Sequence, residues 1–374
     1  MGSNRKIAFL VFVCLLAVSL AKGQEVLHVR AGTEDGLQNF ETIQEAVDAA
    51  APGATIYVYP GLYDGFILRK AVKILGAGFN RAGSSGNPPP GSLTRVGSTV
   101  RLVNNASNAE LSGLSLATVS VESVDNIFIS GCALDRLQLQ RTNNVIVESC
   151  FFENSTSYYS FGSAVGVADT VSAIFNQCMF VNPYSSSRHG TGYSVGHHSS
   201  TSSPSTAFYR TDLSFTRCVF SLSTIFPWGG GEVNYENCIF LNYNNRGTEY
   251  SVSVNSGQYV ATTVNRSVFV GEQSGSDNSS LDANRYQVDP ESIFVGWPIN
   301  NGSAYSFDTR FQLSPNSPAR GFASDGGDCG PYGGPTPYVP SGTPSIPWIY
   351  NLSVPTANPT EESINVNVKV RTQN

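Results

Sequence analysis

The sequence contains few charged residues: Asp, Glu, Lys and Arg together make up 13% of the chain, about half the usual share of a globular protein. No basic patch is present and the net charge is −6. These features argue against binding to nucleic acid or to an anionic membrane surface. No long amphipathic helical pattern is present either, whereas Gly, Asn, Ser, Thr and Tyr are abundant. The composition therefore predicts an all-β protein in which Asn and Gly mark repeated bends.

A long hydrophobic run occurs at the N-terminus, from Ile7 to about Ala21, directly after Arg5 and Lys6. It is short for a membrane span, and small residues suitable for cleavage follow it. We expect residues 1–23 to be a signal peptide, with an uncleaved anchor as the alternative. The mature chain would then be secreted or attached to the cell surface, and would have no transmembrane segment.

A nine-residue pattern occurs seven times, at spacings that run from 18 to 40 residues. The copies begin at Asn108, Asn126, Asn144, Ser172, Asp212, Glu232 and Ala261. Each copy alternates in apolar character, as a half-buried strand does. A period near 20 residues is one turn of a β-solenoid, whose stacked turns bury a continuous core. The longer spacings predict inserts near 155–171, 183–206, 221–231 and 243–258, all on the same side of the solenoid.

The seventh position of the repeat is a cysteine in five copies. These residues are Cys132, Cys150, Cys178, Cys218 and Cys238. Stacking would place them in one internal column, where cysteine behaves as a small buried hydrophobic residue. The alternative is a disulfide between stacked neighbours. A metal site is not expected, because the sequence has no Cys-x-x-Cys pair and no matching histidine spacing.

The start of the mature chain predicts a cap for the solenoid. Residues 40–50 form a helical pattern in which Thr42 and Glu45 make a capping box. Strands are expected at Thr55–Tyr59 and Val72–Leu75. The stretch 40–77 resembles the opening of the pectin-lyase-like β-helix superfamily, in which a helix plugs the first coil. The resemblance implies a right-handed parallel β-helix with a short N-terminal capping helix, and it implies no particular activity.

The end of the chain has a second resemblance. The segment Phe311–Gly334 is similar to the closing segment of secreted bacterial β-helix proteins, which implies export and the same fold. Pro-rich sequence follows, and then two strand-like pieces at Trp348–Val354 and Ile364–Val370. We therefore divide the mature chain into a β-helix over 24–335 and a Pro-rich linker with a β-hairpin over 336–374. The hairpin would either cap the last coil or serve as a sorting or attachment element.

The enzymes of this superfamily have local signatures, and none is complete in this sequence. Gly61-Leu62-Tyr63-Asp64 resembles pectin methylesterases, but their Gln-Asp-Thr string is missing. The Asn-x-Asp and Asp-Asp strings of polygalacturonase-like hydrolases are also missing. The clustered acids that hold Ca²⁺ in pectate-lyase-type elimination are not visible. The string Asp325-Gly326-Gly327-Asp328 is interpreted as a terminal turn rather than a Ca²⁺ loop, so no cofactor is expected.

The insert near 183–206 carries the candidate catalytic residues Arg188, His189, Tyr193 and His197. Such a group could transfer protons or bind a metal. The alternative is a polar Ser/Gly loop that happens to contain histidine.

Aromatic residues are frequent in and beside the inserts. The candidate ligand-binding residues are Tyr158, Tyr159, Tyr184, Tyr209 and Trp228. Aromatic rings on a weakly charged surface suit stacking on sugar rings, although the same rings could simply pack the loops against the solenoid. The leading hypothesis is a secreted or cell-surface protein that binds polysaccharide or glycan, and it leaves open whether the protein also catalyses a reaction. A carbohydrate-active enzyme, either a polysaccharide lyase or a glycoside hydrolase, and a structural or adhesive surface protein are the alternatives.

Overall fold

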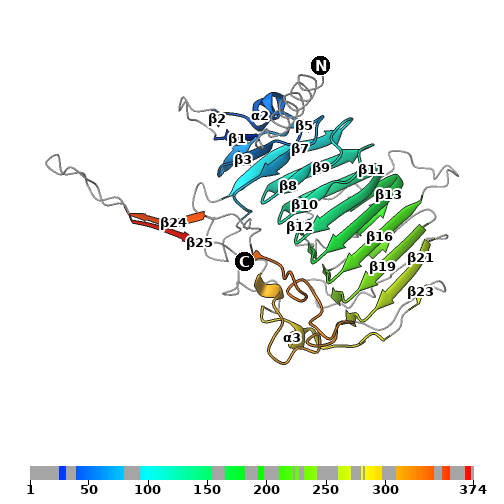
Figure 1. The fold of residues 1–374 in the computed structure, drawn as a ribbon. Helices are drawn as coiled ribbons and strands as arrows, with labels where there is room; N and C mark the ends of the chain where they lie inside the picture. Colours follow the sequence, from blue (N-terminus) through cyan, green and yellow to red (C-terminus); the bar gives the residue numbers. More distant parts are fainter. Residues whose placement is uncertain are drawn as a thin grey trace, which may run out of the picture.

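The computed structural model describes a large part of the chain. The described residues are 25–30, 39–79, 93–153, 165–181, 193–197, 210–221, 224–226, 231–241, 260–270, 279–280, 283–296, 309–340, 348–353 and 367–371. Apart from an antiparallel pair near the C-terminus, their strands pair in parallel and wind into a right-handed β-helix, as the sequence predicts (Figure 1). Within the described residues, no helix has both the length and the apolar character that crossing a membrane requires.

Each full coil has three strands, which build three faces of the tube. Four long strands turn a corner and contribute to more than one face: β7 (Thr94–Val103), β9 (Ser115–Glu122), β11 (Ala133–Glu148) and β13 (Val165–Asn176).

The first face contains β1 (Val26–Val29), β3 (Thr55–Val58), β6 (Lys73–Leu75), β8 (Glu110–Ser112), β10 (Phe128–Ser130), the ends of β11 and β13, β16 (Thr211–Thr216), β19 (Gly231–Glu236) and β21 (Val260–Asn265). The short strands β2 (Asn39–Phe40) and β23 (Ser279–Ser280) pair with β1 and β21.

The second face contains β4 (Gly61–Tyr63), the starts of β7, β9 and β11, then β12 (Phe151–Glu153), β14 (Met179–Val181), β17 (Val219–Ser221), β20 (Ile239–Leu241) and β22 (Val268–Phe269). The third face contains β5 (Ile67–Leu68), the later parts of β7, β9 and β11, the start of β13, β15 (Tyr193–His197) and β18 (Thr224–Phe226). The nine-residue repeat covers the first face, one corner and the second face.

The corner inside the repeat is formed by the sixth position, whose backbone is left-handed in every copy. These residues are Gly113, Gly131, Ser149, Gln177, Arg217, Asn237 and Arg266, with φ between 49° and 65°. Left-handed backbone favours Gly and Asn, yet Gln and Arg also occupy this position. One residue in this conformation turns the chain sharply, so that the apolar positions on both sides face the interior.

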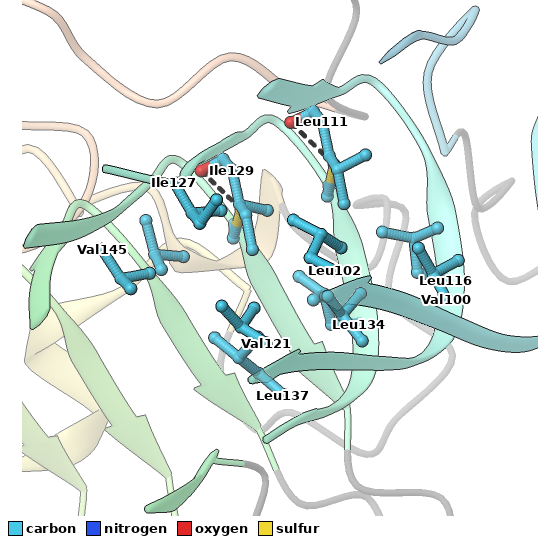
Figure 2. Packing of buried hydrophobic residues seen from close by; sticks show 14 of the residues in the cluster. Val100, Leu102, Leu111, Leu116, Val121, Ile127, Ile129, Leu134, Leu137 and Val145 are labelled. Atoms are coloured by element: carbon cyan, nitrogen blue, oxygen red, sulfur yellow. Dashed lines mark hydrogen bonds between the residues drawn. The ribbon is translucent and has the colours of Figure 1, made fainter. Parts of the chain in front are cut away.

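The cysteine column lies inside the tube, as predicted. All five cysteines are buried and free, so no disulfide joins stacked neighbours. Each sulfur lies near the carbonyl oxygen of the fourth position in the preceding coil, for example Cys132 Sγ to Leu111 O at 3.7 Å and Cys150 Sγ to Ile129 O at 3.6 Å (Figure 2). Each sulfur also lies near a carbonyl of its own copy, for example Cys132 Sγ to Ser130 O at 3.3 Å. A thiol in this column is therefore a weak donor with a carbonyl acceptor in its own coil and another in the coil before it.

The interior is aliphatic in the early coils (Figure 2) and aromatic in the later ones. Ring centroids of Phe180 and Phe220 are 4.9 Å apart, and those of Phe220 and Phe240 are 5.1 Å apart, in stacked geometry. A parallel stack contains Phe215 and Tyr235, and it meets the first stack edge to face. The fold therefore repeats the same ring contact from coil to coil.

The segment 311–340, which we name the strap, runs along the second face. It covers an outward column at the eighth position of the repeat, composed of Ala133, Phe151, Met179, Val219, Ile239 and Val268. Phe322, Cys329 and Tyr338 of the strap belong to the same buried cluster. Gly330 has φ 82° and approaches Ile239 so closely that a Cβ atom would lie 2.8 Å from Ile239 Cδ1. The strap thus gives the solenoid a second, external core.

The corner residues anchor the strap. Arg217 Nη2 lies 2.5 Å from Asp325 Oδ2, and Arg217 Nε donates to the carbonyl of Asp328. Asn237 Oδ1 accepts from the backbone N–H of Ser324 at 2.8 Å. Gln177 Nε2 donates to the carbonyl of Gly333 at 2.9 Å. Long polar side chains at the corner are therefore buried because they hold the strap.

Residues 325–328 form a tight turn, as the sequence predicts. Asp325 Oδ1 accepts from the N–H of Gly327, and both aspartates face arginines: Arg217 pairs with Asp325 and Arg320 with Asp328. The turn is thus part of the strap.

The ends of the fold follow local sequence signals. Thr42 is the N-cap of helix α2 (Ile43–Ala49), and its side chain and that of Glu45 form a reciprocal capping box. Helix α3 (Pro290–Ile293) and the 3₁₀ turn η1 (Thr309–Phe311) precede the strap. Strands β24 (Trp348–Ser353) and β25 (Asn367–Arg371) pair antiparallel as a hairpin.

The predicted inserts are wrong in part, because three of them contain a strand of the third face. β13 begins at Val165, inside the expected insert 155–171, and β15 and β18 lie inside 183–206 and 221–231. The third-face part of β13 and strand β15 are short and include Gly166 and Gly196, and β18 has only three residues. Their apolar pattern is therefore weak in the sequence. The expected insert 243–258 lies outside the described residues.

The aromatic stack predicts a large cost for truncating one ring. We expect Phe220→Ala to destabilise the fold by about 3–5 kcal/mol, because a fully buried ring between two stacked rings leaves a cavity. Denaturant unfolding of the variant would measure the loss. Thr263→Ala, at an exposed position of β21, is the control and should change stability by less than about 0.5 kcal/mol. Equal effects of the two substitutions would contradict the interior placement of Phe220.

The ion pair between Asp325 and Arg217 predicts that the stability of the fold depends on pH. The N–H of Gly327 and the Arg217 guanidinium lower the pKa of Asp325. A lowered folded-state pKa means that the carboxylate stabilises the fold above the unfolded value of about 3.9, and that this contribution is lost as the pH falls through the folded value. We expect Asp325→Asn to lower the melting temperature at pH 7, and the difference from wild type to shrink as the pH falls below the unfolded value of about 3.9. A difference that persists unchanged down to pH 2.5 would contradict this assignment.

Candidate functional site

The outer side of the third face carries a continuous column of polar residues and glycine. Strand register aligns one residue from each of five successive coils: Arg101, Ser120, Gln138, Gly166 and Gly196. Ser120 and Gln138 are partly exposed and Arg101 is exposed, while their neighbours along each strand are buried. We name this column the third-face strip.

A ladder of alternating charges borders the strip where the strands end. Arg101 Nη2 lies 3.7 Å from Glu122 Oε2, Arg141 Nη2 lies 3.2 Å from Glu122 Oε1, and Arg141 Nη1 lies 3.9 Å from Asp169 Oδ2. Gln140 Nε2 donates to Asp169 Oδ2 at 2.9 Å. We name these four charged residues the charge ladder. It holds two guanidinium groups in place while leaving about half of each side chain exposed to solvent.

The corner that follows these strands explains why the ladder is regular. Asn104, Ser123, Arg141 and Asp169 all have left-handed backbone, with φ between 47° and 60°. Each follows the last paired residue of its third-face strand, so the chain turns at the same point in four coils. Arg141 Nε donates to Ser123 Oγ across one coil, which ties adjacent corners together.

The strip changes character in its last two coils. Gly166 and Gly196 pair in register, and we name these two positions the glycine floor. A glycine inside a strand often marks a place where a ligand or another backbone approaches closely, because no side chain intervenes. The strip therefore combines hydrogen-bonding side chains in the early coils with positions that carry no side chain in the later ones.

Two of the four predicted catalytic residues lie on a strand of the third face. Tyr193 and His197 belong to β15, where Tyr193 pairs with Thr224 and His197 pairs with Val167. Val167 belongs to a buried column, so the register gives no support to a role for His197 on the outer face. Arg188 and His189 lie outside the described residues.

The predicted ligand-binding residues also lie outside the described part of the chain: Tyr158, Tyr159, Tyr184, Tyr209 and Trp228. In the sequence, Tyr158, Tyr159 and Tyr184 fall between a second-face strand and the next third-face strand, whereas Tyr209 and Trp228 fall between a third-face strand and the next first-face strand. The segments that carry them therefore begin or end at the third face.

Sequence reasoning missed the third-face strip and the charge ladder. A signal for them exists: Glu122 and Gln140 are 18 residues apart, as are Ser123 and Arg141. This is the spacing of the first copies of the repeat, so extending the repeat beyond its ninth position would have aligned these residues. Gly166 and Gly196 are separated by an insert, and only strand register aligns them.

Metal and nucleophile chemistry find no support among the described residues, where no three His, Cys, Asp or Glu side chains gather closely enough to hold a metal ion. Burial, reinforced by the adjacent thiol of Cys150, raises the pKa of Cys132 well above its usual range. Burial also raises the pKa of Cys329 to about 12. A thiol must deprotonate to act as a nucleophile or metal ligand, so these cysteines are structural.

Comparison with known proteins finds similarity in three-dimensional structure alone. No protein-family model matches the chain, and no curated protein matches its sequence. Among solved structures, pectate lyase Pel9A has a TM-score of 0.45 and 13% identity, over 81% of this chain and 92% of that chain. A pectin methylesterase from Aspergillus niger has a TM-score of 0.33 and 13% identity, over 72% of this chain and 93% of that chain. The fold described above rests on the strand register of this chain itself.

The buried thiols predict a simple titration. We expect Ellman's reagent to react with none of the six cysteines from Cys132 to Cys329 in the folded protein, because all six are buried and free. All six should react after unfolding in guanidinium chloride. A denatured protein with fewer than six reactive thiols in this region would mean that a disulfide exists.

Proposed function

We propose that this chain binds a linear glycan along the third face of its coils, outside the cell or at the cell surface. The observation that carries the proposal is the third-face strip, in which Gln138 and Ser120 continue in register into the glycine floor. Parallel strands repeat at about 4.8 Å, so the strip offers the same kind of contact at short, regular intervals. A long polymer with repeated hydroxyl groups suits such a surface.

The chemistry of the strip and the ladder favours a carbohydrate. Amide and hydroxyl groups can donate to and accept from sugar hydroxyls, and the guanidinium groups of Arg101 and Arg141 add exposed donors. Both arginines are paired with carboxylates, so the surface is polar without a strong excess of one charge. An aromatic residue in any segment that adjoins this face could stack on a sugar ring.

Catalysis is the second candidate function. Arg188 and His189 precede Tyr193 in the sequence, and Tyr193 belongs to the strand that contributes Gly196 to the glycine floor. A proton-transferring pair at this point of the chain would adjoin a bound polymer. The two candidates differ in outcome: a binding module retains the glycan unchanged, whereas a lyase or hydrolase releases unsaturated products or new reducing ends.

A glycan array combined with product assays tests both candidates. Binding without product supports the module, and turnover that disappears in His189→Ala supports the enzyme. Absence of both binding and turnover on every polysaccharide would overturn the proposal and favour a structural or adhesive surface protein.

The role of the glycine floor in glycan binding can be tested with a double variant. We expect Gly166→Val together with Gly196→Val to weaken glycan binding at least tenfold, because two β-branched side chains would prevent close approach of the ligand. Valine suits a strand, so an unchanged melting temperature would show that the fold is retained. Thr263→Val on the first face is the matched control. Unchanged affinity of the folded double variant would place the binding surface elsewhere.

A further inference from the structure

The outward column of the first face contains an unexplained apolar run. In register across the coils it is Lys73, Glu110, Phe128, Ile146, Ile174, Ser214, Asn234 and Thr263. Only the residues from three adjacent coils are apolar. We name these residues, Phe128, Ile146 and Ile174, the apolar strip. Ile174 is 38% exposed, and the other two are partly exposed.

On the second face, an outward apolar column is covered by another segment of the chain. There the column is apolar from Ala133 to Val268, where the strap covers it, and it carries Ser115 and Arg95 in the two coils before. An outward apolar run over several coils thus coincides with a covering segment. Neither buried cluster of the described residues includes the apolar strip, so its covering segment is still to be identified.

The surroundings of the apolar strip define the chemistry of its partner. Glu148 lies two residues beyond Ile146 on the same strand, and Glu110 precedes Phe128 in the column. Glu110 pairs with Lys73 at 2.9 Å, whereas Glu148 has no cationic partner among the described residues. A complementary segment would have apolar residues at its centre and basic residues beside them.

The C-terminal hairpin of this chain has that pattern. In β25, Val368, Lys369, Val370 and Arg371 alternate between apolar and basic residues. The register pairs Val370 with Ile349 and Val368 with Leu352, and it pairs Lys369 with Asn351. Alternation along a strand therefore assigns the apolar pairs to one face of the hairpin.

The hairpin also needs a partner. A two-stranded hairpin alone is marginally stable in water. Figure 1 shows β24 and β25 apart from the coils of their own chain, and within the described residues they pair only with each other. Among the described strands, the hairpin therefore has no partner that could stabilise it.

We propose that the C-terminal hairpin of one copy of this chain docks on the apolar strip of a second copy. The apolar pairs of the hairpin cover Phe128, Ile146 and Ile174, and the basic residues of β25 complement Glu148 and Glu110. In the proposed dimer each copy gives one hairpin and receives one, so the exchange is reciprocal and the assembly has closed twofold symmetry. This inference is independent of the glycan proposal, which concerns the third face.

Sedimentation velocity of the full chain over a range of concentrations tests the proposal. We expect a concentration-dependent dimer, and Ile174→Lys should raise its dissociation constant at least tenfold. A chain that ends at residue 340 should be monomeric. Thr263→Lys, in the same column outside the apolar strip, is the control and should remain dimeric.

A charge exchange makes the test specific. Glu148→Lys should weaken the dimer, and adding Lys369→Glu to that variant should restore it. A wild-type chain that is monomeric at all concentrations would overturn the proposal. So would a dimer that Ile174→Lys leaves unchanged, or a monomer whose melting temperature falls equally on truncation at 340 and on Ile174→Lys, because that result would place the hairpin on its own chain.

Discussion

Register between parallel strands is the constraint on which this structure depends. Each coil has too few residues to enclose a core, so its apolar side chains are buried only by the coils above and below. The same position must therefore recur at the same place in every coil, and a shift by one residue would turn buried side chains outward. The left-handed residue at the sixth position keeps this register, because it makes the chain turn at one fixed point in all seven copies.

Register fixes which positions face the interior, but it does not fix the residue types in the outward columns of the three faces. On the second face, the outward column is apolar and a strap from the end of the chain covers it. On the third face, the outward column is polar or glycine from Arg101 to Gly196, between Ile67 and Phe226, and this stretch is the basis for the functional proposal. The first face has a short apolar run between polar neighbours. The residue type in each outward column thus follows what lies on that face.

Much of the core could be predicted from the sequence, because its signal is periodic. The cysteine and phenylalanine positions recur in a fixed pattern. The first helix is predicted by a local signal, the capping box of Thr42 and Glu45. The third-face strands escaped prediction because Val165–Ala168 and Tyr193–His197 are short and include glycine. The strap contacts could not be predicted, since Gln177 and Gly333 are 156 residues apart and nothing local links them. The candidate site depends on the third-face strands, because its residues align only when these strands are placed.

The position of the strap has a consequence for the order of assembly. Its hydrogen bonds to Asn237 and Gln177 join residues 87 to 156 positions apart in the chain, and its apolar contacts need a row of side chains from several stacked coils. Contacts between such distant residues close large loops and form slowly. The coils can grow by adding one neighbour at a time, but the strap has no surface to join until they are complete. We therefore expect the strap to dock late in folding, after the coils have stacked with the apolar column of their second face still exposed to water.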